Sequence, residues 1–234
     1  MASGKAVNNS GMRPIDLVRR DLLAAQWLPG GKLQPAVLAA RYDTSTTVIR
    51  EALTGLASDD LVVIKPNRGF FVRDLNLTDL NDITELRCTT EALAVKLSIE
   101  RGGLTWESGL IAAHHELTRT PRRTSEDPGH INEDWAVAHR AFHAKLLQAC
   151  ACPLMMRLAA NLADHTELYR RWAAPSPAAA VRDVEKEHRD ILEAALARDA
   201  DRAAALLRAH YQATVDVVLE SGLVQGIESP SPAS

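Results

Sequence analysis

Apolar residues in the first third of the chain change from a helical to a strand-like pattern. They recur every three or four positions after Pro14, with Ile15, Val18 and Leu22 on one face, and form a short β-branched run after Leu61. With the turn residues between them, they predict three helices at 14–26, 36–42 and about 45–57, and two strands at 61–64 and 70–72. This order is typical of a winged helix-turn-helix, which we place at residues 13–74.

Beyond Asp74 the strand signals stop and helical spacing continues. Six helices are expected, at about 78–101, 106–118, 131–149, 153–172, 180–197 and 201–221. The fold class is therefore mainly α, with an N-terminal winged helix-turn-helix and a C-terminal all-helical antiparallel bundle over residues 77–221. The polar ends of the chain, residues 1–12 and 224–234, are expected to be a disordered leader and a disordered tail.

The composition is that of a globular protein without a membrane segment. Of the 234 residues, 46% are hydrophobic and 24% charged, enough for a buried core in one large or two small domains. No apolar run is long enough to span a membrane, and residues 1–12 lack the apolar centre of a signal peptide. Cys88, Cys150 and Cys152 are too few and too irregularly spaced for a disulfide framework, so we expect a reduced, cytoplasmic setting.

The net charge of -3 is unevenly distributed. Residues 13–73 hold 9 Lys or Arg and 6 Asp or Glu, a balance of +3, whereas the remaining 18 and 24 give -6. A mildly basic N-terminal part joined to an acidic body is typical of DNA binding by the N-terminal part alone.

Several polar residues of the N-terminal part are placed to contact double-stranded DNA. In a helix-turn-helix the start of the second helix meets base edges in the major groove, and the wing reaches a neighbouring groove. The candidate DNA-binding residues are Arg41, Ser45, Thr46, Thr47, Arg50, Arg68 and Gly69. Arg50 can bind guanine or phosphate with two hydrogen bonds, and Gly69 permits the tight turn of the wing.

Each of these residues also has a purely structural interpretation. Serine and threonine at a helix start commonly cap the helix, and Arg50 could pair with Glu51 or Asp43 on the surface. The ordered helices and wing together nevertheless favour DNA binding by the segment.

Residues 13–73 resemble the N-terminal domain of the GntR family of bacterial regulators. The resemblance rests on Trp27–Gly30, Leu38-Ala39, Ser45–Thr47, Ile49–Leu53 and Arg68-Gly69. Two features depart from the family pattern. Thr46 stands where the family usually has arginine, and the segment 34–37 lacks a usual arginine. We therefore expect an unusual operator sequence or weaker binding.

Four histidines fall on the apolar stripes of three predicted helices. His139 and His143 are spaced i, i+4 and so point the same way from one helix, while His188 and His210 lie on two others. A single inward histidine is usually a core residue bonded to a carboxylate or carbonyl. Four of them in one domain favour a shared site, because separate buried imidazoles would each need a partner. The other histidines, His114, His115, His130 and His165, show no such pattern and are interpreted as surface or incidental residues.

Residues 77–218 resemble the FCD ligand-binding domain of the FadR subfamily of GntR regulators. The matching residues are Leu86-Arg87, Glu91, His139–His143, Glu187-His188, Asp199 and His210. The resemblance implies a divalent metal held by one acidic residue and three histidines, which map to His143, His188 and His210. His139 stands at the acidic position. An all-imidazole set favours zinc or nickel over manganese and leaves the site one negative charge short.

Such a metal could hold the carboxylate of a small organic acid as effector. Arg87 is the candidate second anchor, with an i, i+4 ion pair to Glu91 as the alternative role. Asn161 and Arg170 or Arg171 lie on a helix that could line the same cavity. The pair Cys150 and Cys152 is interpreted as structural.

The sequence thus predicts a metabolite-sensing transcriptional repressor, binding a palindromic operator as a homodimer, rather than an enzyme. One alternative is a regulator that works without metal, whose histidines bond the effector directly. The other is a zinc hydrolase, which is disfavoured because Arg140 stands where a metalloprotease helix carries its glutamate base.

Overall fold

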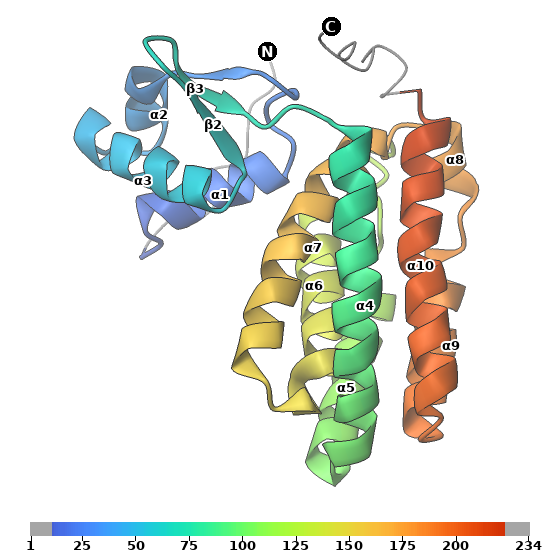
Figure 1. Cartoon of the computed structure of the whole chain (residues 1–234). Coiled ribbons are helices and arrows are strands. Elements are labelled where there is room, and N and C mark those ends of the chain that lie inside the picture. The colour runs from blue at the N-terminus through green and yellow to red at the C-terminus, as the bar shows by residue number, and fades with distance from the viewer. Residues whose placement is uncertain (1–10, 223–234) are drawn as a thin grey trace, which may run out of the picture. The chain divides into compact units, whose positions relative to one another are not determined.

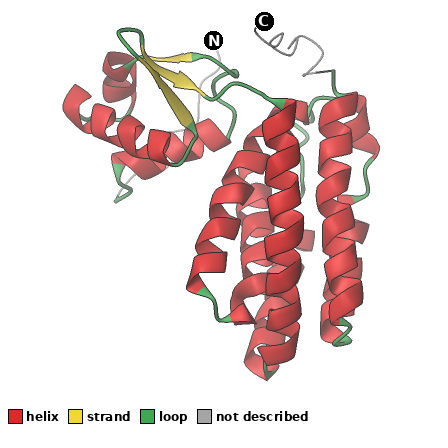
Figure 2. Ribbon diagram, in the orientation of Figure 1, coloured by secondary structure: helices red, strands yellow, loops and turns green. Residues whose placement is uncertain are grey.

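The protein is mainly helical, with one small sheet (Figures 1 and 2), and the computed structural model describes residues 11–222. It divides into two compact units, the first ending at Leu75 and the second beginning at Asn76. The predicted fold class is therefore confirmed. The expected disordered leader and tail lie outside the described residues, apart from Gly11 and Met12.

The first unit consists of three helices and a three-stranded antiparallel sheet with the strand order β1-β3-β2. Its elements are α1 (Pro14–Leu23), β1 (Lys32–Leu33), α2 (Pro35–Arg41), α3 (Thr46–Ser58), β2 (Val62–Lys65) and β3 (Gly69–Val72). Leu22, Ile49 and Leu53 are buried in its core. This is the winged helix-turn-helix that the sequence pattern predicts.

Two details of this unit differ from the sequence prediction. Helix α1 ends at Leu23 instead of Gln26, because Ala25 adopts a left-handed backbone with φ of 54°. Strand β1 was not predicted. It is only two residues long, pairs Lys32 with Phe71 across the sheet, and has no periodicity of its own to detect.

The second unit contains only helices within the described residues. They are α4 (Leu77–Arg101), α5 (Leu104–Arg119), α6 (Glu133–Leu147), the 3-10 turn Gln148–Cys150, α7 (Pro153–Ala173), α8 (Pro177–Val181), α9 (Val184–Leu196) and α10 (Ala200–Glu220). Helix α4 packs against α6, α7 and α10, and α9 packs against α5 and α10 (Figure 1). Phe142 and Leu110 are among the fully buried side chains of this bundle.

The predicted helix at 180–197 is wrong at its beginning. Helix α8 starts at Pro177 and ends at Val181, and α9 starts only at Val184, after Arg182 in an extended conformation. Asp183 accepts a hydrogen bond from the backbone nitrogen of Lys186 and so caps α9. The break turns Arg182 towards the interior of the bundle, where it contributes to the site described below.

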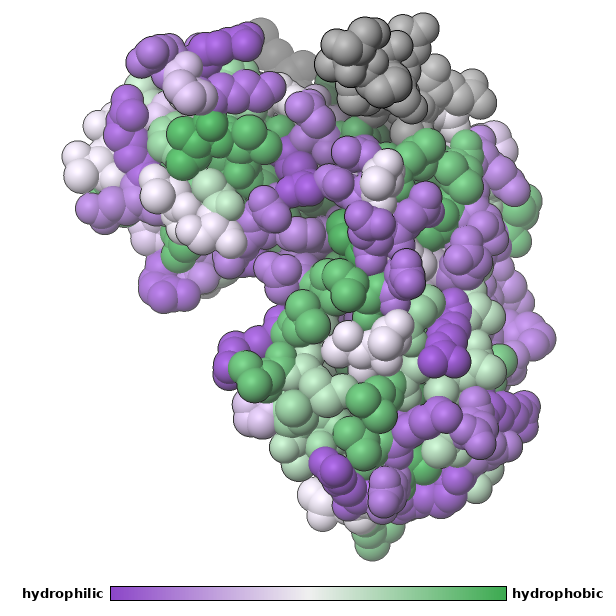
Figure 3. Space-filling view, in the orientation of Figure 1, coloured by the Kyte–Doolittle hydropathy of each residue, from purple (hydrophilic) through white to green (hydrophobic). Residues whose placement is uncertain are grey.

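Hydrophobic side chains gather on one face of the helical unit, over α4 and α7 (Figure 3). Four exposed leucines belong to these two helices: Leu86 and Leu93 on α4, and Leu154 and Leu158 on α7. No helix within residues 11–222 is long and apolar enough to cross a membrane.

Candidate metal centre and nucleic-acid interface

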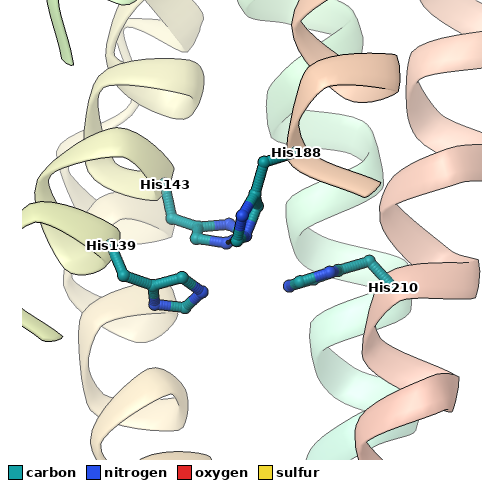
Figure 4. A group of neighbouring side chains, drawn as sticks. All are labelled: His139, His143, His188 and His210. Carbon is teal, nitrogen blue, oxygen red and sulfur yellow. Dashed lines mark hydrogen bonds between the residues drawn. The ribbon is translucent and has the colours of Figure 1, made fainter. Parts of the chain in front are cut away.

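His139, His143, His188 and His210 meet in the interior of the helical unit (Figure 4). All four are buried, and one nitrogen from each can be chosen so that the four atoms lie within 4.8 Å of one another. Helix α6 carries His139 and His143 one turn apart, while α9 and α10 each bring one ring from the opposite side. The sequence pattern selected these four residues, and the packing of three helices joins them.

Burial keeps all four imidazoles neutral near pH 7. Loss of solvent lowers the pKa of His139, His143 and His188 well below its usual range, and nearby positive charges lower it further. For His210 burial lowers the pKa to about 4, although Glu187 opposes the shift. Neutral imidazole is the form that binds a metal, so the cluster is ready for one at physiological pH.

A second layer of side chains holds His210 in one tautomer. Its Nδ1 lies 2.6 Å from a carboxylate oxygen of Glu187, so Nδ1 donates and Nε2 keeps its lone pair. Arg182 donates to Glu187 at 2.6 Å and to the backbone oxygen of His210 at 2.7 Å. Burial favours the neutral acid, but the bonds from His210 and Arg182 lower the pKa of Glu187 to about 2. Sequence reasoning missed Arg182, because it lay within a predicted continuous helix.

Three guanidinium groups surround the cluster, and each is paired with a carboxylate. Arg87 donates to Glu91 at 2.6 Å, and Arg182 donates to Glu187. Arg170 pairs with Glu167 on the same helix. The pairs cancel the positive charge that would otherwise repel a cation, and their donors remain close to the imidazoles.

The donor set fits a divalent transition metal. Two nitrogens bound to one tetrahedral zinc ion lie about 3.4 Å apart, as follows from Zn–N bonds of about 2.1 Å. The Nε2 atoms of His143 and His188 lie 3.3 Å apart. Nδ1 of His143 is buried without a hydrogen-bond partner among the described residues. An all-nitrogen set suits zinc or nickel better than manganese or magnesium.

His139 differs from the other three histidines because one arginine nitrogen lies within hydrogen-bonding distance of both of its ring nitrogens. Nη1 of Arg170 lies 2.9 Å from Nδ1 and 3.2 Å from Nε2 of His139. Trp135 stacks on His139, with their ring centres 4.7 Å apart, and the guanidinium of Arg170 lies 5.5 Å from the centre of the same indole ring. A metal must therefore compete with Arg170 for the lone pair of His139, whereas the other three rings face no such competitor.

A cavity of about 110 Å³ lies beside the histidines, between α6, α7 and α4. Arg87 lines it and forms the ion pair with Glu91 that was the alternative role, while its role as an effector anchor stays a prediction. Asn161 does not line it. The lining residues of α7 follow the helical spacing Ala159, Ala160, Ala163, Thr166 and Arg170, and Asn161 points about 100° away from Ala160. Arg170, which the sequence analysis also named, does line the cavity.

The remaining histidines were interpreted as surface or incidental residues, and His165 does not lie on the surface. Its side chain is buried within α7. Helix α7 carries buried polar residues on several sides, among them Asp164 and Glu167, so its apolar stripe is a poor guide to its buried face. His115 and His130 are exposed, and His114 is half-buried.

The first unit carries a positively charged hollow between the start of α3 and the wing. Lys32, Thr46, Arg50, Arg68 and Gly69 line it, and no carboxylate does so among the described residues. Arg50 makes no side-chain hydrogen bond or ion pair within residues 11–222, so the alternative of pairing with Glu51 or Asp43 is not what the structure shows. Sequence reasoning missed Lys32, which reaches the hollow only because β1 joins the sheet.

Other predicted DNA-binding residues are partly engaged within the unit. Oγ of Ser45 accepts from the backbone nitrogen of Val48 at 3.2 Å and caps α3, while Thr47 is exposed on the first turn. Arg41 donates to buried Asp21 at 2.8 Å and lies over the ring of Trp27. Its guanidinium remains half-exposed but does not line the hollow.

Comparison with known proteins agrees with this arrangement of a DNA-binding unit and a helical unit. Residues 15–72 match the family described as bacterial regulatory proteins, gntR family, and residues 82–213 match the FCD domain. The chain belongs to the GntR family. It carries the FCD type of helical domain, and the matched families and named relatives are regulators of transcription rather than enzymes.

Two curated relatives match this chain over most of their own length. The uncharacterized HTH-type transcriptional regulator BphR of Paraburkholderia xenovorans is 34% identical over 208 residues, which are 89% of this chain and 84% of BphR. The HTH-type transcriptional repressor GlaR of Escherichia coli is 27% identical over 207 residues, 87% of this chain and 93% of GlaR. This GntR regulator therefore shares its two-part organisation with both.

Solved structures show the same fold. E. coli McbR/YncC matches with a TM-score of 0.74 and 19% identity, over 88% of this chain and 95% of that one. A putative GntR regulator from Rhodococcus sp. RHA1 matches with a TM-score of 0.72 and 22% identity, over 88% and 96%.

Proposed function

We propose that this GntR regulator is a repressor whose operator binding is controlled by a small carboxylate effector at a metal site. The four-histidine cluster beside a cavity lined by three arginines is the observation that carries the proposal. His139, His143, His188 and His210 would hold a divalent metal, zinc or nickel. When bound, the metal would supply positive charge and a coordination position for a carboxylate oxygen.

The DNA partner would be a palindromic operator, read by a homodimer in the cytoplasm. Helix-turn-helix domains commonly read two half-sites related by a two-fold axis. The exposed leucines of α4 and α7 offer an apolar surface for a second copy of the chain. The effector would act by binding one of two dimer arrangements more tightly, and so shifting their populations.

A metal-free regulator is the second candidate, and two contacts favour it. Arg170 occupies the nitrogens of His139, and His143 and His188 can bond each other without any ion. In that case the histidines would donate directly to the effector.

Elemental analysis of protein purified without an affinity tag separates the two candidates. We expect about one zinc or nickel ion per chain in the native protein and none in His143→Ala. DNase footprinting near the protein's own gene, with both proteins, tests operator binding independently. Absence of metal from both proteins, with an intact footprint, would leave the metal-free regulator. A monomer that protects no DNA would contradict the repressor itself.

A further inference from the structure

The cavity beside the histidines is polar at one end and apolar at the other. Its lining on α6 runs from His139, Arg140 and His143 to Ala144 and Leu147. On α7, lining residues run from Arg170, Glu167 and Thr166 to Ala163, Ala160, Ala159 and Met156. The contact between Arg170 and His139 places both polar ends together. The short link from Leu147 to Pro153 brings both apolar ends together.

The polar end is suited to one carboxylate. Arg87, Arg140 and Arg170 line the cavity, and each is ion-paired with a carboxylate, from Glu91, Asp164 and Glu167 respectively, so the polar end offers guanidinium donors without a net charge. Nε of Arg170 and Nδ1 of His143 are both buried without a hydrogen-bond partner among the described residues. An oxygen acceptor from a ligand would satisfy donors that the fold leaves unpaired.

The apolar end offers nothing to a second charge. Ala144, Leu147, Met156, Ala159, Ala160 and Ala163 contribute only methyl groups, an isobutyl group and a thioether. A carboxylate or a set of hydroxyl groups buried there would lose water without gaining a partner. A hydrocarbon body, in contrast, is favoured in proportion to the area that it buries.

The dimensions set the size of that body. The cavity measures about 110 Å³. An engineered apolar cavity of about 150 Å³ holds benzene. This cavity is smaller, so it takes a short branched alkyl group, and it takes a ring only where it opens to solvent at the exposed Ala144 and Ala160. From His143 to Leu147 the lining rises about 6 Å along the helix, at about 1.5 Å per residue. This length accommodates one ring or one branched alkyl group.

We infer that the effector is a monocarboxylate with a compact apolar body, of the chemical class of benzoate or 3-methylbutanoate. Dicarboxylates, hydroxy acids and sugar acids should bind more weakly, because the apolar end gives their additional polar groups no partner. The alanines on α7 act as specificity residues, because larger side chains there would fill the space for the body. The inference deepens the proposed function and rests on it, since it assumes that the cavity holds the controlling acid.

Isothermal titration calorimetry of the purified full chain, after its metal content has been measured, tests this inference. The four ligands are benzoate, 3-methylbutanoate, succinate and lactate. We expect at least one apolar acid to bind about tenfold more tightly than succinate and lactate, since each buried methylene is worth a few-fold in affinity. Ala160→Leu should weaken that binding about tenfold while DNA binding without effector is unchanged.

Ala160 is exposed at the cavity wall, so leucine there does not disturb the buried core. Ala112→Leu is the matched control, because Ala112 is exposed on α5 and does not line the cavity. Succinate or lactate binding as tightly as the apolar acids, or unchanged binding in Ala160→Leu, would overturn the inference and leave the proposed function standing. Failure of all four acids to bind would overturn the inference and, with it, the carboxylate control in the proposed function.

Discussion

The Nε2 atoms of His143 and His188 lie 3.3 Å apart, although 45 positions separate the two residues in the sequence. Without a metal, one Nε2 must donate to the other. With a metal, both present a lone pair to the same ion. The fold thus places two imidazoles at a separation that suits either state, and metal binding can change the hydrogen bonding of the cluster without a large movement.

Removal of metal is expected to lower the melting temperature. A metal present at 100 times its Kd stabilises the folded protein by about 2.7 kcal/mol, because it binds the assembled site and not the unfolded chain. Differential scanning calorimetry with and without a chelator measures the effect. His188→Ala should melt at the same temperature in both conditions, and the exposed His115→Ala should behave like the native protein. A native protein indifferent to the chelator would contradict a structural contribution from metal.

Arg170→Met is expected to strengthen zinc binding. The substitution removes a positive charge next to the cluster and frees the nitrogens of His139, while Glu167 remains bonded to Arg171. Loss of one charge at this range corresponds to roughly tenfold in affinity. Competition with a chromophoric chelator gives the zinc Kd. Arg157→Met, at an exposed position on the same helix, is the control. Weaker zinc binding in Arg170→Met would mean that the arginine supports the site instead of competing with it.

Stability of the metal-free protein is expected to fall as the pH drops below 6.5. Burial lowers the pKa of His210 to about 4, so the unfolded chain takes up a proton that the folded protein does not. The contribution of His210 to the free energy of unfolding is therefore complete above its pKa in the unfolded chain, about 6.5. It is lost as the pH falls towards 4. The loss from this residue is on the order of 3 kcal/mol.

Urea unfolding of chelator-treated protein between pH 7.5 and 5 measures this loss of stability. The range spans the reference pKa of histidine, about 6.5, and stays above that of glutamate, about 4.3, so Glu187 does not contribute. His210→Asn should reduce the pH dependence by the share of one histidine, because His139, His143 and His188 also stay neutral in the folded protein. His115→Asn should leave it unchanged. Equal slopes in all three proteins would show that His210 is not buried in the neutral form.

Lys32 and Arg50 are expected to contact DNA phosphate or bases from the hollow of the first unit. Each alanine variant should weaken operator binding, and a lost phosphate contact lowers the slope of log affinity against log salt by about 0.9. Fluorescence anisotropy over a salt series gives both quantities. Arg157→Ala, on the helical unit, is the charge-matched control. A Lys32→Ala variant with native affinity and slope would place DNA elsewhere on the unit.

Ser45 is expected to act first as a helix cap. Ser45→Ala should destabilise the protein by about 1 kcal/mol, because the Val48 backbone nitrogen loses its acceptor. Ser45→Asp retains a cap but adds negative charge at the start of α3, and should therefore keep stability and lose DNA affinity. Chemical unfolding and DNA binding, measured on both variants, separate the two roles. Native DNA affinity in Ser45→Asp would remove Ser45 from the interface.

The sequence by itself determined the identity of the four histidines and the order of elements, apart from β1 and the break between α8 and α9. Helical periodicity depends only on residues one or two turns apart, so it places His143, Phe142 and Leu146 on one buried side of α6 without knowledge of the fold. The winged helix-turn-helix is equally local, because its turns are encoded by residues such as Pro66 and Asn67, the latter with a left-handed φ of 58°.

Only the tertiary structure decided how the histidines are surrounded. Arg182 enters the site because α8 and α9 are separate helices, and Arg170 reaches His139 because α6 and α7 lie side by side. Asn161 and Ala160 are neighbours in the chain, yet only Ala160 lines the cavity. Contacts between residues tens of positions apart depend on how whole helices cross and rotate against each other, and no local pattern of polar and apolar residues specifies that geometry.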